Sequence, residues 1–238
     1  MVLSRLPSEL LLAIMQALDH PRDLAALVKA SPLCCRLYFA APSLVVSCIL
    51  RNAIQPDALH DALAVLHAPW TPDPGALSWA RPSREPLRAC LEQYFDKAKP
   101  FAFPSEWKDL MALDRLLFRA TYFVNDYSSE ARMVLFSDGG ADPSAPLSPT
   151  ELARFQRAFF RYELYSRLFP PDCREANYSL EPAQEQFDRF LARIEPWEAE
   201  EMSCVHCYYT SLIGKLVDDM EDGAVGNVHS YDARSLVD

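Results

Sequence analysis

The stretch that decides the fold opens the chain and reads Leu6-Pro7-Ser8-Glu9-Leu10-Leu11-Leu12-Ala13-Ile14, followed by Asp23-Leu24-Ala25-Ala26-Leu27 and Ala30-Ser31-Pro32. An apolar residue recurs at every fourth position of the first segment, at Leu6, Leu10, Ile14 and Leu18. This spacing is typical of one face of a helix. Proline suits the first turn of a helix, because its missing N–H needs no partner there, and it stands at 7, 21, 32 and 42. The pattern predicts three or four short helices within residues 1–52.

These short helices carry more apolar surface than so small a unit can bury by itself. A surplus of this kind marks an interface. The interface is either with a partner protein or with the rest of the same chain, and the periodicity alone leaves both open.

The same residues resemble the F-box, in the variant found in many fungal proteins. The likeness rests on Leu-Pro-x-Glu-Leu at 6–10, Asp-Leu at 23–24 and Ala-Ser-Pro at 30–32. Ala-Ser-Pro replaces the more usual Val-Cys followed by a basic residue, and no tryptophan follows Arg36. The resemblance implies that residues 1–52 dock a Skp-type adaptor protein and, through it, a cullin. It also implies eight residues that face the adaptor or form the core of the module, two roles that the sequence does not separate: Leu6, Pro7, Leu10, Leu11, Ile14, Leu18, Leu24 and Leu27.

Composition favours an all-α fold for the whole chain. Half of the 238 residues are hydrophobic and 24% are charged, which is typical of a folded protein. The chain has only 6 glycines, which disfavours a fold built on tight β-turns, and many of its 19 prolines precede helical patterns. Beyond the F-box-like module, an irregular helical domain is expected over 53–222. Its predicted helices cover 56–67, 87–98, 149–169, 182–194 and 196–222, with a long one from 105 to either Asn125 or Phe136.

Three segments between or after these helices are predicted to lack regular structure. A proline-rich linker is expected near 69–86, and its Trp70 and Trp79 leave open whether it lies against a surface. A loop of turn-forming residues is expected near 137–147, and a flexible tail over 223–238 after the glycines at 223 and 226. Arg132-Met133-Val134-Leu135-Phe136 is a weak strand candidate.

Charge narrows the class of partner. The formal net charge is -10, which argues against nucleic acid, because phosphate contacts need clustered Lys and Arg. Residues 1–52 hold five basic and three acidic side chains, a net of +2, which leaves -12 for the remainder and fits an acidic partner for the module. The sequence begins without a secretory signal pattern, and no apolar run approaches the roughly 18 residues that span a bilayer. We therefore expect no membrane association, reduced cysteines, and a cytoplasmic or nuclear location.

No local motif predicts catalysis, a metal or a cofactor. Cys204-Val205-His206-Cys207 resembles half of a zinc site, but it lies within a helical pattern and no second ligand pair follows. Glycine-rich phosphate loops and nucleophile-elbow motifs are absent from the sequence. The acidic residues at 218–222 are expected to be a solvated helix end, which could also serve as an interaction segment. We expect no enzyme, no metal site and no cofactor.

The function that follows is that of a substrate-recognition subunit of a Skp–cullin–F-box ubiquitin ligase. The N-terminal helices would bind the adaptor, and the helical remainder would hold a target protein whose identity the sequence does not give. The alternative is a non-catalytic helical scaffold whose F-box-like unit does not bind the adaptor. Residues 147–222 also resemble the C-terminal region of fungal F-box-like proteins, in Tyr162-Glu163-Leu164-Tyr165-Ser166-Arg167-Leu168-Phe169 and Pro196-Trp197-Glu198-Ala199-Glu200-Glu201, and that likeness implies no activity.

Overall fold

The computed structural model describes residues 6–69, 84–135, 146–169 and 180–232, and every regular element within them is a helix. Residues 1–195 form one compact unit and residues 196–238 a second. The expected all-α class is therefore confirmed. In chain order the α-helices are α1 (Ser8–Gln16), α2 (Pro21–Ala30), α3 (Pro32–Ala40), α4 (Pro42–Ala53), α5 (Pro56–His67), α6 (Arg84–Phe95), α7 (Trp107–Leu135), α8 (Pro149–Leu168), α9 (Leu180–Arg189) and α10 (Pro196–Asp232).

Prolines fix where the N-terminal helices begin. The helices α2, α3, α4 and α5 each start on a proline, and the preceding residue caps two of them through its side chain. His20 accepts a hydrogen bond from the backbone N–H of Arg22, and Ser31 accepts one from Cys34. The first helix differs slightly from expectation, because Pro7 is its N-cap and Ser8 its first helical residue.

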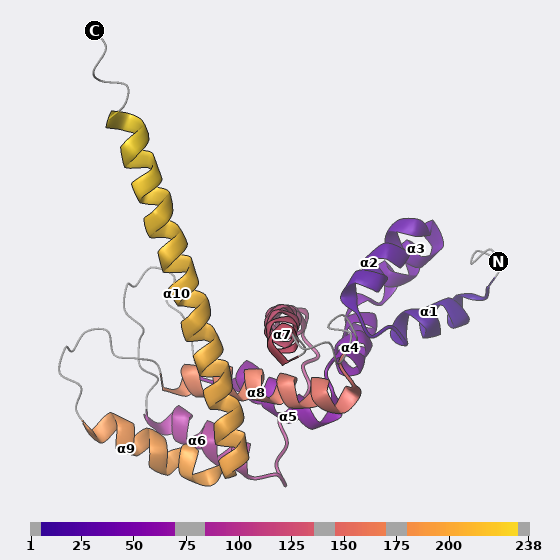
Figure 1. The fold of residues 1–238 in the computed structure, drawn as a ribbon. Coiled ribbons are helices and arrows are strands. Elements are labelled where there is room, and N and C mark those ends of the chain that lie inside the picture. The colour runs from indigo at the N-terminus through magenta and orange to yellow at the C-terminus, as the bar shows by residue number, and fades with distance from the viewer. Residues whose placement is uncertain (1–5, 70–83, 136–145, 170–179, 233–238) are drawn as a thin grey trace. The chain divides into compact units, whose positions relative to one another are not determined.

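The centre of residues 1–195 is the pair α5 and α8, which pack along each other (Figure 1). The long helix α7 contacts α4, α5 and α8, while α6 packs on α5. At the other end α1, α2 and α3 gather around α4, which leads directly into α5 (Figure 1). Residues 1–52, expected as a separate module, thus belong to the same compact unit as residues 53–195.

Polar side chains of α8 hold the two ends of α5. Gln156 accepts a hydrogen bond from the backbone N–H of Gln55 at 2.8 Å and donates one to the carbonyl of Ala53 at 3.1 Å. Near the other end, Arg167 Nη1 donates to the carbonyl of Val65 at 3.1 Å. These bonds satisfy backbone groups that helix ends leave without partners. They also fix the register of α5 against α8.

Ser148 and Glu151, three residues apart, predict a capping box at the start of α8, and the structure confirms it. Ser148 Oγ accepts from the backbone N–H of Glu151, and the Glu151 carboxylate accepts from the backbone N–H of Ser148 at 2.8 Å, which is a complete capping box. Hydrogen bonds from Ser148 lower the pKa of Glu151 below its ordinary value of 4.5. A lowered folded-state pKa stabilises the folded chain above pH 4.5, and this contribution is lost as the pH falls through the lowered value.

Replacing Ser148 by alanine is expected to lower the free energy of unfolding by about 1 kcal/mol, because the first turn of α8 loses its side-chain cap. Urea titration followed by circular dichroism measures this. Thr150→Ala is the matched control, since Thr150 is exposed one residue from Glu151 and makes no cap. Equal stability of the Ser148→Ala variant and the wild type would show that the cap contributes nothing.

Several sequence predictions are corrected by the described residues. The long helix runs unbroken past Asn125 to Leu135, so Arg132 to Leu135 are helical and not a strand. The last helix continues through Gly223 and Gly226 to Asp232, ten residues beyond its expected end. Within the expected linker, α6 already begins at Arg84. The rest of that linker (70–83, with Trp70 and Trp79), most of the expected loop (136–145) and the end of the tail (233–238) lie outside the described residues.

The last helix, described by itself, has an apolar stripe that is only partly buried. Met202, Val205 and Tyr208 are buried. The continuation of the stripe is exposed at Ile213, Leu216, Val217 and Met220. Helical periodicity from Val205 to Met220 predicts one stripe that is buried along its length and stabilises the helix, and the exposure of its second half contradicts that prediction.

Candidate interaction surface

The eight residues predicted to serve docking divide into three groups. Leu11 and Leu24 are buried. Leu6, Leu18 and Leu27 are half-buried. Pro7, Leu10 and Ile14 are exposed. The structure thus separates the two roles that the sequence left together, since buried residues form the core of α1–α4 and exposed ones are open to a partner.

The helix α1 has one face toward the core and one toward solvent. Leu11 and Met15 are buried, at 1% and 0% exposed, where α1 packs on α3 and α4. Leu10 and Ile14 lie on the other face and are 52% and 39% exposed. They form a short exposed apolar stripe at four-residue spacing, which we call the α1 stripe, while the half-buried Leu6 and Leu18 lie just beyond the two ends of the helix.

A side chain from α4 fixes the end of α1 and so the direction of this stripe. Asn52 Nδ2 donates to the carbonyl of Gln16 at 2.8 Å and to that of Leu18 at 2.9 Å. Both carbonyls lie where α1 ends and its backbone acceptors have no helical partner. Because α4 in turn packs on α7 and leads directly into α5, the α1 stripe is joined to the remainder of residues 1–195.

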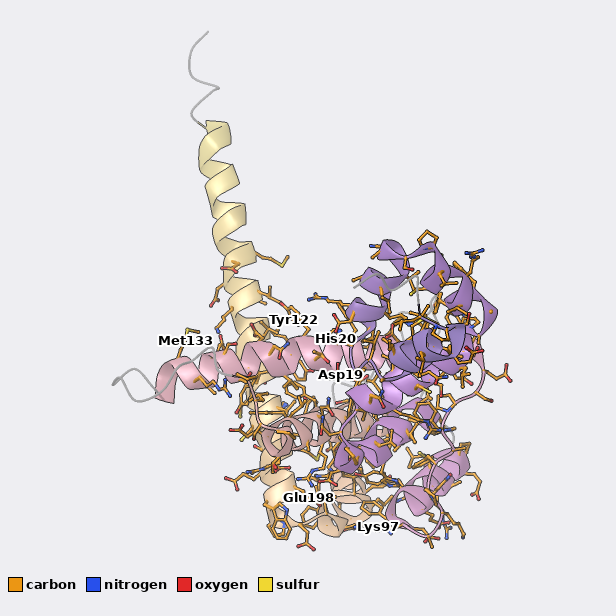
Figure 2. The ribbon with its side chains drawn as sticks, turned by 90° about the vertical axis from the view of Figure 1, so that its right-hand side faces the viewer. Asp19, His20, Lys97, Tyr122, Met133 and Glu198 are labelled. Atoms are coloured by element: carbon orange, nitrogen blue, oxygen red, sulfur yellow. The ribbon has the colours of Figure 1, made fainter. Side chains whose placement is uncertain are left out.

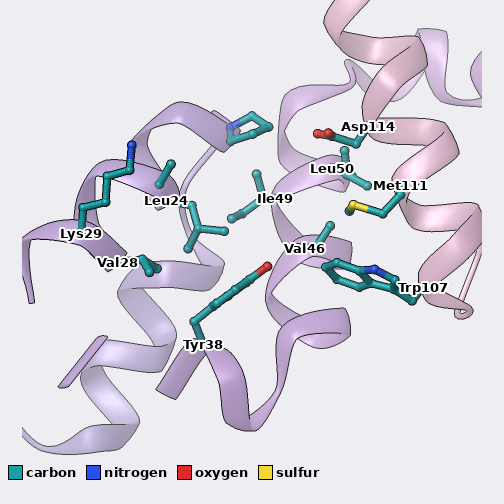
Figure 3. A pocket seen from close by; sticks show the side chains of 12 residues that line it. Leu24, Val28, Lys29, Tyr38, Val46, Ile49, Leu50, Trp107, Met111 and Asp114 are labelled. Atoms are coloured by element: carbon teal, nitrogen blue, oxygen red, sulfur yellow. The ribbon is translucent and has the colours of Figure 1, made fainter. Parts of the chain in front are cut away.

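A hollow lies between α2, α3, α4 and the first turns of α7, and sequence reasoning missed it (Figure 3). Its volume is about 350 Å³. Its walls are mostly apolar, with Leu24, Val28, Ile49 and Met111 among them. Trp107 stands at its rim with a 43% exposed side chain. The helical spacing of Trp107 and Met111 was visible in the sequence, but nothing in it showed that α2 and α4 would face them.

A second, more polar hollow of about 670 Å³ adjoins the first one. Asp19 and His20 line it from the start of α2, and Phe118 and Tyr122 from α7. Phe118 and Tyr122 are both exposed, and Figure 2 shows Tyr122 on α7 beside this region. Pro21 and Asp114 line both hollows, so the two meet at these residues.

A buried polar cluster joins α5, α6 and α8, and local sequence patterns gave no sign of it. The hydroxyl of Tyr94 donates to Asp61 Oδ1 at 2.5 Å and accepts from Arg161 Nε at 3.1 Å. Arg161 Nε lies 3.7 Å from Asp61 Oδ1, and both side chains are less than a tenth exposed. Burial, and next the Asp61 charge, raise the pKa of Tyr94, so the phenol keeps its proton. None of these residues lines either of the two hollows.

The cysteine and histidine residues that resemble half of a zinc site lie on α10. Cys204, His206 and Cys207 are all exposed. Among the described residues, no three His, Cys, Asp or Glu side chains gather closely enough to hold a metal ion. The absence of a structural metal stays a prediction, which metal analysis of the purified protein would test.

The cysteines should differ strongly in reactivity toward an alkylating reagent. Cys204 and Cys207 are exposed, whereas Cys34 and Cys90 are buried. Burial also raises the pKa of Cys90 to about 11, which removes the reactive thiolate at neutral pH. With iodoacetamide at pH 8, mass spectrometry should find Cys204 and Cys207 modified well before Cys34 and Cys90, with Cys90 modified only after unfolding. Early modification of Cys90 in the folded chain would contradict the packing of α6.

No single described helix is both long and apolar enough to cross a membrane. One bent pair, Pro32–Ala40 with Pro42–Ala53, meets the criteria of length and composition together, with an angle of 96° between its halves.

The class that these elements define is all-α, with an exposed apolar stripe on α1 and two hollows along α7. No protein-family model, no curated protein and no solved structure matches the chain.

Proposed function

We propose that this chain is the substrate-recognition subunit of a Skp–cullin–F-box ubiquitin ligase. The observation that carries the proposal is the α1 stripe, because Leu10 and Ile14 are exposed within the segment that resembles the F-box. Exposed leucine and isoleucine side chains at four-residue spacing suit the groove of a helical partner. The buried residues of the same helix hold it in place, so the stripe is presented without rearrangement.

The proposal also requires that the chain hold a target protein, and the way α1–α4 join the rest of the chain supports this. Such a subunit acts by holding a target near the ubiquitin-carrying enzyme, which raises the effective concentration of the target there. A rigid connection favours this, because a target surface on α7 keeps a fixed place relative to the adaptor. That connection consists of the contacts of α4 with α7, the direct continuation of α4 into α5, and the Arg51 guanidinium 3.8 Å from the centre of the Phe103 ring.

The distribution of charge along the chain is compatible with an acidic adaptor protein as the partner. Residues 1–52 carry a net of +2, while the remainder of the chain is acidic. An acidic adaptor would be attracted to the N-terminal helices and repelled by the remainder, which favours one orientation of the complex.

The proposal is tested by isolating the intact chain from cells of its own organism and identifying its partners by mass spectrometry. We expect a Skp-type adaptor and a cullin with the wild-type chain and neither with the Leu10→Ala, Ile14→Ala variant. Removal of residues 1–52 is a poorer control, because it removes nearly all of α4 and with it the contacts of α4 with α7.

The alternative function is a helical scaffold whose N-terminal helices bind no adaptor. The observation that favours it is that residues 1–52 and 53–195 share one compact unit, so part of their apolar surplus is used inside the chain. Recovery of stable partners without any Skp-type adaptor would support this alternative.

A further inference from the structure

The hollow between α2, α3, α4 and α7 is apolar in its middle and charged at its two ends (Figure 3). Its middle is apolar, with Leu24 and Ile49 buried at the back and Val46 beside them. Figure 3 shows Lys29 and Asp114 at opposite ends of this apolar middle. A ligand that fills the hollow therefore meets a positive charge at one end and a negative charge at the other.

Asp114 is an acidic residue in the lining of this hollow. Its side chain is half-buried, and it accepts no hydrogen bond and forms no ion pair with any residue in the described ranges. Burial raises the pKa of Asp114, and the nearby Arg115 opposes that rise. A ligand that brings a cationic donor to this half-buried carboxylate makes a charge-assisted hydrogen bond beside apolar walls, which adds affinity.

Tyr38 adds a second polar contact inside the hollow. Its hydroxyl is directed into the hollow in Figure 3. Burial and the negative charge of Asp114 raise the pKa of Tyr38, so this hydroxyl stays protonated and can donate or accept. The indole of Trp107 at the rim offers an aromatic face as well.

We propose that this hollow binds an amphipathic helix of a target protein, with an apolar side chain in the middle and an arginine or lysine at Asp114. The volume of about 350 Å³ lies at the lower end of the roughly 300–1,000 Å³ typical of ligand pockets. A groove walled by helices receives a helix through apolar residues at three- and four-residue spacing. The opposite charges at its ends fix the direction of that helix. The statement that the bound helix belongs to a ubiquitination target rests on the proposed function. The preference of the hollow for a cation at Asp114 rests on the hollow alone.

The test uses two labelled helical peptides of about 15 residues, a length at which such peptides begin to form helices. Both carry leucines at three- and four-residue spacing and a glutamate at one end of that stripe, opposite Lys29, and they differ by one arginine or one glutamate at the other end. Fluorescence anisotropy with the full chain should show the arginine peptide binding about tenfold more tightly, because glutamate would face Asp114. Asp114→Asn should abolish this preference, whereas Asp109→Asn, on an exposed acid of the same helix, should retain it.

Two variants, each with a bulky side chain introduced on α2, test whether the peptides bind in this hollow. Ala25 and Ala26 are both exposed on α2, but only Ala25 lines this hollow. Ala25→Trp should abolish binding of both peptides and Ala26→Trp should not, with folding checked by circular dichroism. Equal affinity for the two peptides, absence of binding at hundreds of micromolar, or binding that survives Ala25→Trp would each overturn the inference.

Adaptor binding, measured on the same wild-type preparation, separates this inference from the proposed function. Adaptor binding without the arginine preference overturns the inference alone. The arginine preference without adaptor binding supports the hollow as a helix-binding site of a scaffold protein.

Discussion

Replacing Asp61 by alanine is expected to lower the free energy of unfolding by about 3–5 kcal/mol, because the change removes a buried carboxylate that faces a buried arginine and accepts from a buried tyrosine. Asp61 accepts from the Tyr94 hydroxyl at 2.5 Å and lies 3.7 Å from Arg161 Nε. Its removal takes one contact from each of these partners in the interface between α5, α6 and α8. Urea unfolding monitored by circular dichroism gives the free energy.

Two controls make this result specific to the cluster. Asp57→Ala, on an exposed residue of the same helix, should cost at most about 1 kcal/mol, from its position in the first turn. Replacing the whole cluster with Asp61→Leu, Tyr94→Phe and Arg161→Met should recover much of the loss, since apolar residues often replace a buried ion pair without penalty. A loss below about 1 kcal/mol for Asp61→Ala would mean that the three side chains do not form the buried cluster.

The second large effect concerns binding. The double change Leu10→Ala, Ile14→Ala should weaken the complex with the Skp-type adaptor by about 2–4 kcal/mol, or roughly 30- to 1,000-fold. The chain should remain folded, because these side chains are 52% and 39% exposed. A purified-component titration measures the affinity.

The matched control replaces the neighbouring residues 11 and 15 of α1, which lie on its buried face. Leu11→Ala with Met15→Ala truncates two buried side chains, and each should cost about 2–5 kcal/mol of stability. Loss of folding in this pair, with loss of binding in the Leu10 and Ile14 pair, would establish the two faces of α1. Unchanged affinity after Leu10→Ala, Ile14→Ala would remove the α1 stripe from the docking surface.

Local signals in the sequence predicted the helices well. Prolines 21, 32, 42, 56, 149 and 196 each occupy the first position of a helix, as their missing N–H and fixed φ favour. Ser148 and Glu151 predicted their capping box from their spacing alone. These features depend on residues within one turn of each other, so a single sequence contains the information.

Features that depend on distant residues were not predictable in this way. Asp61, Tyr94 and Arg161 are brought together from three helices, and no pattern within any one of them signals the others. The hollow at Asp114 likewise depends on residues far apart in the sequence, because α2, α4 and α7 all line it. Periodicity also could not show that the α10 stripe would be exposed from Ile213 onward, because a stripe looks the same whether or not a neighbour covers it.

The most direct test of the central claim is an isothermal titration of the purified full-length chain with the Skp-type adaptor of its own organism. We predict saturable one-to-one binding at tens of micromolar or tighter, and its loss in the folded Leu10→Ala, Ile14→Ala variant. Absence of binding by the folded wild-type chain at those concentrations would contradict the claim and leave the scaffold function in its place.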